Sequence, residues 1–459
     1  MAVVTSIASL TAAPELQILA ITPAADGVAL NWTDLGSAYT YTVESRDSLS
    51  GGQWQPCPLT GGWPTQVARW KDARSASAGT RYYRIVAAPV PVQRGKLIAS
   101  KLVKSWSSDE LAGIFKLADI GVTPEYGVEF HKLTYETVDP FGARTTASGA
   151  LALPVNPTRA APLVSYQHGT ITLKTDVPSA LSAEAFIGIV LGATGYAAAS
   201  PDYLGLGDSP GFHPYHHAKS EATATIDLLR AARAYCQISS IALNGQLFLC
   251  GYSQGGHATM ATHRELETFH TNEFTLTASA PMAGAYDLSG TTANDFLSGR
   301  TVPNPYYFVY LLAAYQEAYH LADSLAAMLA SPYDTALPPL LDGSHDSGQI
   351  NAAMGTASPI HILKPEYLEA FKNSSNHPLR VALRDNDLYA WTPRARMRMY
   401  HCHGDQDVIY VNSEVAYNSF IQRGATQVQL MDPDPLGDHG GCAMPSLLGA
   451  KDWFDSLRE

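Results

Sequence analysis

A short apolar run that passes directly into a glycine-rich turn constrains the fold of this chain more than any other stretch. The run at residues 247–252 (LFLCGY) predicts a buried strand, and the residues from Gly255 onward (GGHATMATHRELETF) predict a helix. The turn between them has the pattern G-x-S-x-G, with Ser253 at its centre. A serine on so sharp a turn needs small neighbours, because a Cβ at either flank would clash with the opposing backbone.

The same turn defines a chemical environment for Ser253. It places the serine Oγ at a helix N-terminus, where the helix dipole and the free backbone N–H groups favour developing negative charge. The alternative is a glycine-rich turn with an incidental serine. The strand before the turn, the helix after it and a second small residue, Gly256, favour a nucleophile elbow. Such an elbow requires a base, an acid and an oxyanion hole from the rest of the chain.

Length and charge limit the class of protein. A chain of 459 residues is long enough for two or three domains, and a hydrophobic content of 46% provides for a large core. The net charge of −12 argues against nucleic acid or an anionic membrane surface as a partner. The longest apolar stretch, residues 185–199, is interrupted by glycines and is too short to span a bilayer. We therefore expect a soluble globular protein with no transmembrane segment.

The N-terminus and the cysteines bear on the cellular compartment. Residues 1–16 lack a basic region and a long apolar core, so they are not an intact signal peptide, but they fit the start of a mature secreted protein behind an added Met. The cysteine count of five leaves at least one without an intramolecular partner. Few basic residues (30 Lys and Arg) and many tyrosines (24) fit an exported enzyme. These features predict a secreted or periplasmic protein.

Residues 14–104 differ in pattern from the rest of the chain. Short β-rich runs separated by Gly, Pro, Ser and Asp clusters predict a small β-sandwich, which follows an N-terminal tail at residues 1–13. The run at 96–106 is a candidate for its last strand. Three segments of this part resemble fibronectin type III-like modules of bacterial secreted hydrolases: 30–32 (LNW), 41–44 (YTVE) and 81–85 (RYYRI). The resemblance implies a role in adhesion, spacing or folding, with contact to a surface or matrix and no chemistry.

Residues 105–459 alternate between apolar strands and helices. This alternation predicts an α/β domain with a mostly parallel sheet covered by helices on both faces. The stretch at about 288–395 breaks the pattern, because it is long, partly helical and rich in Pro turns. Connections of this length are usually functional, so we predict a helical cap or lid inserted there. Its aromatic cluster at 306–319 either packs in a core or lines a pocket.

Five segments of this second part form a recognisable set: 167–170 (QHGT), 201–207 (PDYLGLG), 251–256 (GYSQGG), 401–405 (HCHGD) and 438–442 (DHGGC). Together they resemble the secreted α/β-hydrolase lipases and esterases, in the branch that includes fungal secretory lipases and their bacterial relatives. The resemblance covers roughly residues 105–459. It implies an α/β-hydrolase fold and hydrolysis of carboxylic esters without a cofactor, and it leaves the acyl and alcohol groups undefined.

A serine hydroxyl is a poor nucleophile until a histidine takes its proton, and that imidazole needs a carboxylate to hold its tautomer. In α/β-hydrolases the three residues follow the order serine, acid, histidine along the chain. The histidine candidate is His439, which lies in a glycine-rich loop (GDHGG) just before the final predicted helix. The alternative for His439 is an ordinary histidine in a surface turn.

The acid has two candidates. The usual family form is H-G-x-x-D-x-x-V-P, with a serine four residues after the proline. If Val408 is the valine of this form, with Ser413 beyond it, the acid is Asp405, and His401 four residues earlier selects the same residue. Counting from the His-Gly pair selects Asp407 instead. Isoleucine replaces the usual proline, which departs from the family form. Two anchors favour Asp405 and leave Asp407 as its rival.

The oxyanion hole needs two N–H donors. One is predicted on Gln254, immediately after the nucleophile. The second should come from the loop after an earlier strand, where the family form H-G-x puts the donor on the residue after glycine. In this chain that residue is Thr170, with Gly169 as the near alternative.

Two further groups of residues bear on metal binding and on a disulfide. His213, His216 and His217 lie near two aspartates, but their spacing matches no established metal motif, so no metal ligand is predicted. Cys402 and Cys442 each lie beside a loop of the catalytic set, and those loops must approach each other if the acid is to reach the histidine. We therefore predict a disulfide between them.

The sequence thus predicts a serine carboxylic-ester hydrolase that acts through a covalent acyl-enzyme on a small-molecule or polymeric ester. A serine peptidase or amidase on the same fold is the main alternative, because the same residues serve both reactions. The chain offers no acidic pair clearly placed to capture a free substrate N-terminus, which favours esters. A catalytically inactive adhesion protein is the second alternative, and the complete triad argues against it.

Overall fold

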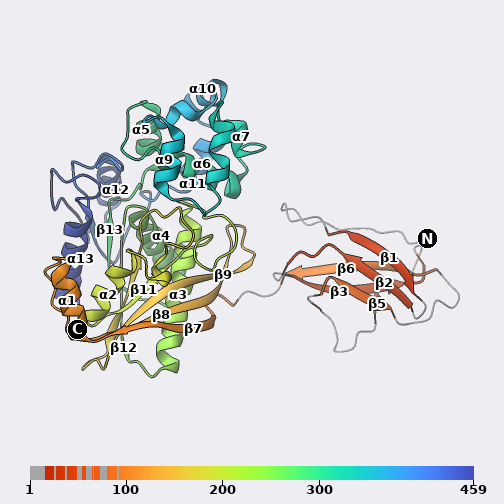
Figure 1. The fold of residues 1–459 in the computed structure, drawn as a ribbon, viewed down its shortest axis with the longest axis horizontal. Helices are drawn as coiled ribbons and strands as arrows, with labels where there is room; N and C mark the ends of the chain where they lie inside the picture. Colours follow the sequence, from red (N-terminus) through yellow and green to blue (C-terminus); the bar gives the residue numbers. More distant parts are fainter. Residues whose placement is uncertain are drawn as a thin grey trace. The chain divides into compact units, whose positions relative to one another are not determined.

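The computed structural model describes residues 16–24, 27–36, 39–48, 54–57, 65, 67–72, 80–89 and 93–459 (Figure 1). The predicted tail at 1–13 lies outside these residues. The chain divides into two compact units, of which the first ends at Val92 and the second begins at Gln93. Each unit has its own core.

The first unit contains two three-stranded antiparallel sheets. Their strands are β1 (Ile18–Ala24), β2 (Gly27–Trp32) and β5 (Arg69–Asp72) in one sheet, and β4 (Gln55–Pro56), β3 (Tyr39–Arg46) and β6 (Tyr82–Pro89) in the other. Leu30 and Trp32 from the first sheet pack with Tyr41, Val43 and Tyr83 from the second in one buried cluster. Two sheets that bury their inner faces against each other form the packing that the alternating sequence pattern predicts.

The predicted boundary at residue 104 is wrong. Strand β7 (Leu97–Trp106) pairs antiparallel with β8 (Val128–Val138), with Leu97 opposite Tyr135 and Trp106 opposite Val128. The strand therefore belongs to the large sheet of the second unit. Its sequence pattern shows that it is a strand, but the choice of partner sheet depends on which edge is free for pairing, and that is a tertiary property.

The second unit is built on a nine-stranded sheet with the order β15-β14-β13-β12-β10-β11-β9-β8-β7. The remaining strands are β9 (Arg144–Pro154), β10 (Ala161–Gln167), β11 (Ala197–Pro201), β12 (Leu243–Tyr252), β13 (Leu276–Met282), β14 (Arg396–Tyr400) and β15 (Val428–Met431). Strands β10 to β15 are parallel to one another, while β11 pairs antiparallel with β9. The carboxyl ends of the parallel strands meet at one edge, where loops carry side chains toward a shared site.

Helices cover both faces of this sheet. The main ones are α1 (Ser108–Leu117), α2 (Ala185–Ala193), α3 (Ala218–Ile238), α4 (Gln254–Phe269), α12 (Val411–Gln422) and α13 (Ala443–Leu457). Along β12, Phe248 packs in a cluster with residues of α1, α2 and α13, whereas its neighbour Leu247 packs with residues of α3 and α4. Successive side chains of a strand point to opposite faces, so the continuous apolar run of β12 serves both layers.

A separate helical layer is inserted between β13 and β14 (Figure 1, teal to cyan). It consists of α5 (Ala293–Leu297), α6 (Tyr306–Tyr319), α7 (Leu325–Met328), α8 (Tyr333–Ala336), α9 (Ser347–Met354), α10 (Pro365–Asn373) and α11 (Pro378–Asp385). Leu312, Tyr315, Met328, Ile350 and Phe371 are fully buried in its core. The layer occupies the stretch that the sequence predicts as an insertion. Among the helices that the structure describes, none has the length and apolar character of a membrane span.

Candidate active site

The turn between β12 and α4 has the geometry of a strained elbow. Ser253 lies between the last residue of the strand and the first residue of the helix, with φ 61° and ψ −121°, a region that non-glycine residues rarely adopt. A Cβ at Gly255 would lie 2.0 Å from the carbonyl oxygen of Gln167 and 2.8 Å from that of His168. Glycine at this position therefore lets the turn lie directly against the loop that follows β10.

Three side chains from three loops form one hydrogen-bonded series at this turn. His439 Nε2 lies 2.8 Å from Ser253 Oγ, and His439 Nδ1 lies 2.6 Å from Asp405 Oδ2. Because a carboxylate only accepts hydrogen bonds, Nδ1 carries the proton and Nε2 is left to accept the serine hydroxyl. The Asp405 side chain is fully buried and that of His439 is 12% exposed, so little water competes with these contacts.

The Asp405 carboxylate is held from several sides. Its Oδ1 accepts hydrogen bonds of 3.0 Å from the backbone N–H groups of Asp407 and Val408, and its Oδ2 also lies 3.3 Å from His401 Nε2. Burial alone would raise the pKa of Asp405, but the hydrogen bonds from His401 and His439 outweigh burial and hold that pKa well below its ordinary value. Asp405 is therefore ionised at neutral pH and oriented toward His439.

The rival aspartate has a different partner. Asp407 accepts hydrogen bonds from the backbone and the side-chain amide of Asn304, at 3.2 and 2.7 Å. Burial raises its pKa. Among the hydrogen bonds of the described residues, none joins Asp407 to His439. Asp405 therefore contacts His439, and Asp407 contacts Asn304 instead.

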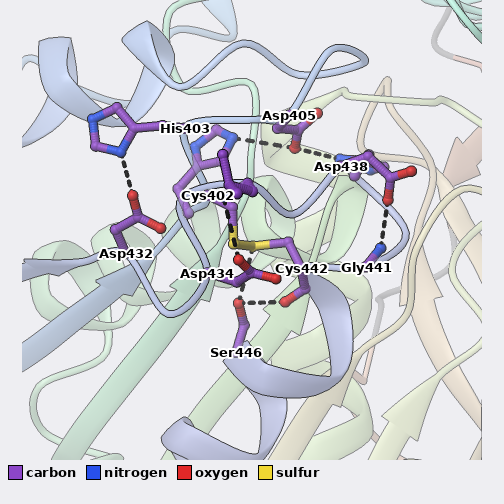
Figure 2. Close-up of a disulfide and its surroundings, with 12 residues drawn as sticks. Cys402, His403, Asp405, Asp432, Asp434, Asp438, Gly441, Cys442 and Ser446 are labelled. Carbon is purple, nitrogen blue, oxygen red and sulfur yellow. Dashed lines mark hydrogen bonds and ion pairs between the residues drawn. A yellow bond between two sulfur atoms is a disulfide. The ribbon is translucent and has the colours of Figure 1, made fainter.

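A disulfide between Cys402 and Cys442 joins the loop after β14 to the start of α13 (Figure 2). Asp405 lies on the first of these loops and His439 precedes Cys442 on the second. A Cβ at Gly404 would lie 2.8 Å from the carbonyl oxygens of both Leu436 and Gly437, so the loops also touch through backbone. Covalent bond and close contact together keep the two loops near each other.

The candidate oxyanion donors come from two segments that meet at the elbow. Gln254 is buried and is the first residue of α4, so its N–H has no intrahelical acceptor. Gly169 and Thr170 follow β10 in the loop that packs against Gly255. Thr170 Oγ1 lies 3.1 Å from the Tyr215 hydroxyl. Both residues of this loop stay candidates for the second donor.

A pocket opens at Ser253. The inserted helical layer contributes Phe296, Val302 and Leu311 to its apolar lining, and Leu288 just before the layer adds to it. Polar atoms come from Asn304, Tyr307 and Asp407. Of the aromatic cluster at 306–319, Tyr307 lines this cavity, whereas Phe308 and Tyr315 are buried in the core of the layer. Part of the aromatic cluster therefore packs in a core, and part of it lines a pocket.

One group of side chains near the elbow has the composition of a metal site. His216, Glu221 and His257 each offer a ligand atom, and these atoms lie within 4.8 Å of one another. However, His257 Nδ1 lies 2.7 Å from Glu221 Oε2, and its Nε2 lies 3.1 Å from the carbonyl oxygen of Asn386. Both ring nitrogens therefore face oxygen atoms of the protein, which occupy them without a metal ion. Glu221 and His257 form a buried ion pair.

The sequence interpretation missed this ion pair. Its signal was present, since Glu221 is a charged residue within a helical run of small and apolar side chains (AKSEATATIDLL), and His257 stands on the first turn after the nucleophile. A glutamate at such a position must be either exposed or paired, and a histidine near the elbow was the available partner.

The chain has recognisable relatives. Residues 174–291, which include Ser253 but neither Asp405 nor His439, match the model of the secretory lipase family. No curated protein matches the chain in sequence.

Among solved structures, the rice cell wall degrading esterase LipA from Xanthomonas oryzae is 28% identical with a TM-score of 0.73, over 80% of this chain and 100% of that chain. A putative hydrolase from Legionella pneumophila is 27% identical with a TM-score of 0.73, over 79% of this chain and 98% of that chain. Candida antarctica lipase A in its closed state shares the fold at 16% identity, with a TM-score of 0.58 over 80% of this chain and 84% of that chain. The fold of the second unit is thus that of α/β-hydrolase esterases and lipases.

Proposed function

We propose that this enzyme, which its relatives identify as a carboxylesterase or lipase, hydrolyses carboxylic esters through a Ser253–His439–Asp405 triad and a covalent acyl-enzyme. The observation that carries the proposal is the hydrogen-bonded series from Ser253 Oγ to His439 at 2.8 Å and from His439 to Asp405 at 2.6 Å. The order of the three residues along the chain and the strained elbow at Ser253 support it as well.

In the first half of the reaction, Ser253 Oγ attacks the ester carbonyl carbon and its proton passes to His439 Nε2. The carbonyl π electrons move onto oxygen and form a tetrahedral oxyanion. His439 then gives its proton to the alcohol oxygen, the bond between that oxygen and the acyl carbon breaks, and the alcohol leaves. Asp405 stays ionised throughout and stabilises the positive charge on His439.

In the second half, a water molecule takes the place of the alcohol. His439 removes one of its protons, the resulting hydroxide bonds to the acyl carbon, and a second oxyanion forms. When this intermediate collapses, Ser253 Oγ leaves with the proton from His439, and the carboxylic acid is released. The backbone N–H groups of Gln254 and Thr170 are proposed to bind both oxyanions, each contributing on the order of 3 kcal/mol in the transition state. Gly169 is the near alternative to Thr170.

The substrate is proposed to place an apolar group in the cavity beside Ser253, with the inserted helical layer acting as a cap. The apolar lining by Leu288, Phe296 and Leu311 supports this. Both small and polymeric esters fit the proposal. LipA from Xanthomonas oryzae is described as a rice cell wall degrading esterase, which supports including plant cell wall esters among the compounds tested.

We further propose that the protein is secreted or periplasmic and that its first unit is a fibronectin type III-like module contacting a surface or matrix. The match to a secretory family supports export. The two sheets around one core in the first unit support a β-sandwich. A comparison of the whole chain with a chain starting at Gln93, for binding to insoluble substrates, tests the role of the module.

The proposed chemistry is tested with one panel of p-nitrophenyl esters of short, long and aromatic acids, together with aminoacyl anilides. Wild-type protein should hydrolyse esters and be labelled at Ser253 by a fluorophosphonate, and Ser253→Ala should lose both properties. Ester hydrolysis that survives in Ser253→Ala near the wild-type rate would falsify the proposal. Faster cleavage of anilides than of esters would assign the same triad to a peptidase or amidase.

A further inference from the structure

The side chain of Gln254 is held in place by hydrogen bonds to two other side chains. Its amide Nε2 lies 3.0 Å from Glu221 Oε1 and 2.7 Å from His213 Nε2, so both amide hydrogens have an acceptor. All three side chains are buried. Gln254 is thus fixed by groups that lie outside its own helix, at the position whose backbone N–H is proposed to bind the oxyanion.

The orientation of this amide is defined by its partners. His213 Nδ1 lies 2.8 Å from the carbonyl oxygen of Leu204 and must donate to it, so His213 Nε2 is an acceptor. Burial lowers the pKa of His213 to about 4, which keeps the ring neutral and this acceptor available. A flipped amide would turn its oxygen toward two acceptors. The amide oxygen, by contrast, has no hydrogen-bond partner among the described residues.

Glu221 is itself held in a fixed, charged state. Its other carboxylate oxygen lies 2.7 Å from His257 Nδ1, and His257 Nε2 reaches the carbonyl oxygen of Asn386, which ends α11. Burial alone would raise the pKa of Glu221, but the pair with His257 and the hydrogen bond from Gln254 lower that pKa to about 2. A hydrogen bond to an ionised carboxylate is roughly twice as strong as a neutral one.

The segment that carries His213 also reaches the other candidate donor. Two residues later, the Tyr215 hydroxyl lies 3.1 Å from Thr170 Oγ1. Tyr215 is buried. The segment at 212–217 therefore contacts the side chains of both residues proposed to bind the oxyanion.

We propose that Glu221, paired with His257, is a positioning residue of the oxyanion hole that acts by fixing the amide of Gln254, an inference that rests on the proposed esterase function. An oxyanion donor must point at the place where negative charge develops, within about 2.7–3.1 Å of it. The peptide between Ser253 and Gln254 belongs to a strained turn, so it keeps its direction only if neighbouring contacts hold it. The Gln254 amide supplies two such contacts.

The direct test removes the two hydrogen bonds of the Gln254 side chain and keeps its backbone N–H. Gln254→Met retains the length of the side chain and loses both hydrogen bonds. We expect kcat to fall about 10- to 100-fold, less than the roughly 10²- to 10³-fold cost of removing an oxyanion donor outright, with KM within about twofold. Affinity for a trifluoromethyl ketone, which forms a tetrahedral adduct with the serine, should fall by the same factor as kcat/KM.

A double-mutant cycle then tests whether Glu221 acts through Gln254. Glu221→Met alone should lower kcat about as much as Gln254→Met, and it should add nothing in the Gln254→Met background. In Glu221→Gln the amide oxygen still accepts from Gln254, and the amide N–H donates to Nδ1 of a neutral His257 whose proton stays on Nε2, so this variant should restore most of kcat. Losses of Glu221→Met and Gln254→Met that multiply would overturn the proposal. If Glu221→Met does not fold, the Gln254→Met result alone decides, and an unchanged kcat there overturns it too.

Helix α4, which carries Gln254 and His257, offers a matched control. Glu267 and His263 form a second carboxylate–histidine pair on α4, at 3.2 Å, near the end of the helix farther from the elbow. Glu267→Met should lower the melting temperature while kcat stays within about twofold. An equal loss of kcat in Glu267→Met would mean that Glu221 acts only through general stability. Failure of the esterase proposal is separate, because the wild-type protein would then lack Ser253-dependent ester hydrolysis altogether.

Discussion

Asp405 Oδ2 lies 2.6 Å from His439 Nδ1, although Asp407, two residues along the same loop, carries an equally suitable carboxylate. The difference comes from the second partner of each group. Asp405 is turned inward by the backbone N–H groups of Asp407 and Val408, whereas Asp407 is turned toward Asn304. The loop thus presents one carboxylate to the histidine and uses the other to contact the inserted helical layer.

This arrangement predicts unequal effects of two equivalent substitutions. Asp405→Asn should lower kcat on the order of 10⁴-fold, because the amide stabilises the wrong tautomer of His439 and cannot stabilise its charged form. Asp407→Asn, the matched control, should change kcat by less than about tenfold. The measurement is kcat and KM on one p-nitrophenyl ester for both variants. A larger loss in Asp407→Asn than in Asp405→Asn would reverse the assignment of the acid.

The disulfide predicts a dependence of activity on redox state. Replacing Cys402 and Cys442 by Ser should cost about 3 kcal/mol of unfolding free energy and lower kcat, because the acid and histidine loops are no longer tied. Reductant should affect the wild-type protein and leave the double variant unchanged. Thiol counting in the denatured, unreduced protein should find three of the five cysteines reactive. A count of five reactive thiols would show that the disulfide does not form.

The sequence predicted well those features that depend on the local pattern of residues. The elbow at Ser253, the alternation of strands and helices, and the insertion before β14 each depend on residues close together in the chain. Ser253, Asp405 and His439 lie within hydrogen-bond distance of one another in series, as expected from their order along the chain. Their catalytic roles stay a prediction.

The features that the sequence did not predict depend on distant partners. The sequence places β7 in the first unit, because its pattern predicts a strand and does not indicate which sheet that strand joins. The pair of Glu221 and His257 was missed because burial of a charge follows from how α3 packs on α4, and helical periodicity alone does not reveal it. Choosing between Gly169 and Thr170 requires the direction of single N–H groups, which no residue pattern contains.

Acid stability should depend on Glu267. Burial would raise the pKa of this group, but His263 and the backbone N–H groups of Arg394 and Ala395 outweigh it and lower the pKa to about 2. Because the folded pKa lies below the ordinary value of 4.5, the stabilisation is fully present above pH 4.5 and is lost as the pH falls toward 2. The difference corresponds to roughly 3 kcal/mol of unfolding free energy.

Urea unfolding at pH 7 and at pH 3 checks this expectation with the variant Glu267→Gln. The wild-type protein should exceed the variant in unfolding free energy at pH 7, and the gap should narrow at pH 3, where the carboxylate begins to be protonated. A gap of the same size at both values of pH would show that the pair contributes through packing and not through charge.

The cavity beside Ser253 should set the preference for acyl size. Phe296 lines this cavity, so Phe296→Ala should enlarge it and raise the ratio of kcat/KM for an octanoate ester to that for an acetate ester about tenfold. Phe269→Ala is the matched control, because that ring is 70% exposed at the end of α4 and does not line the cavity. The measurement is the ratio of the two kcat/KM values in each variant. An unchanged ratio in Phe296→Ala, with kcat on acetate preserved, would place the acyl chain elsewhere and leave the cavity to the alcohol group.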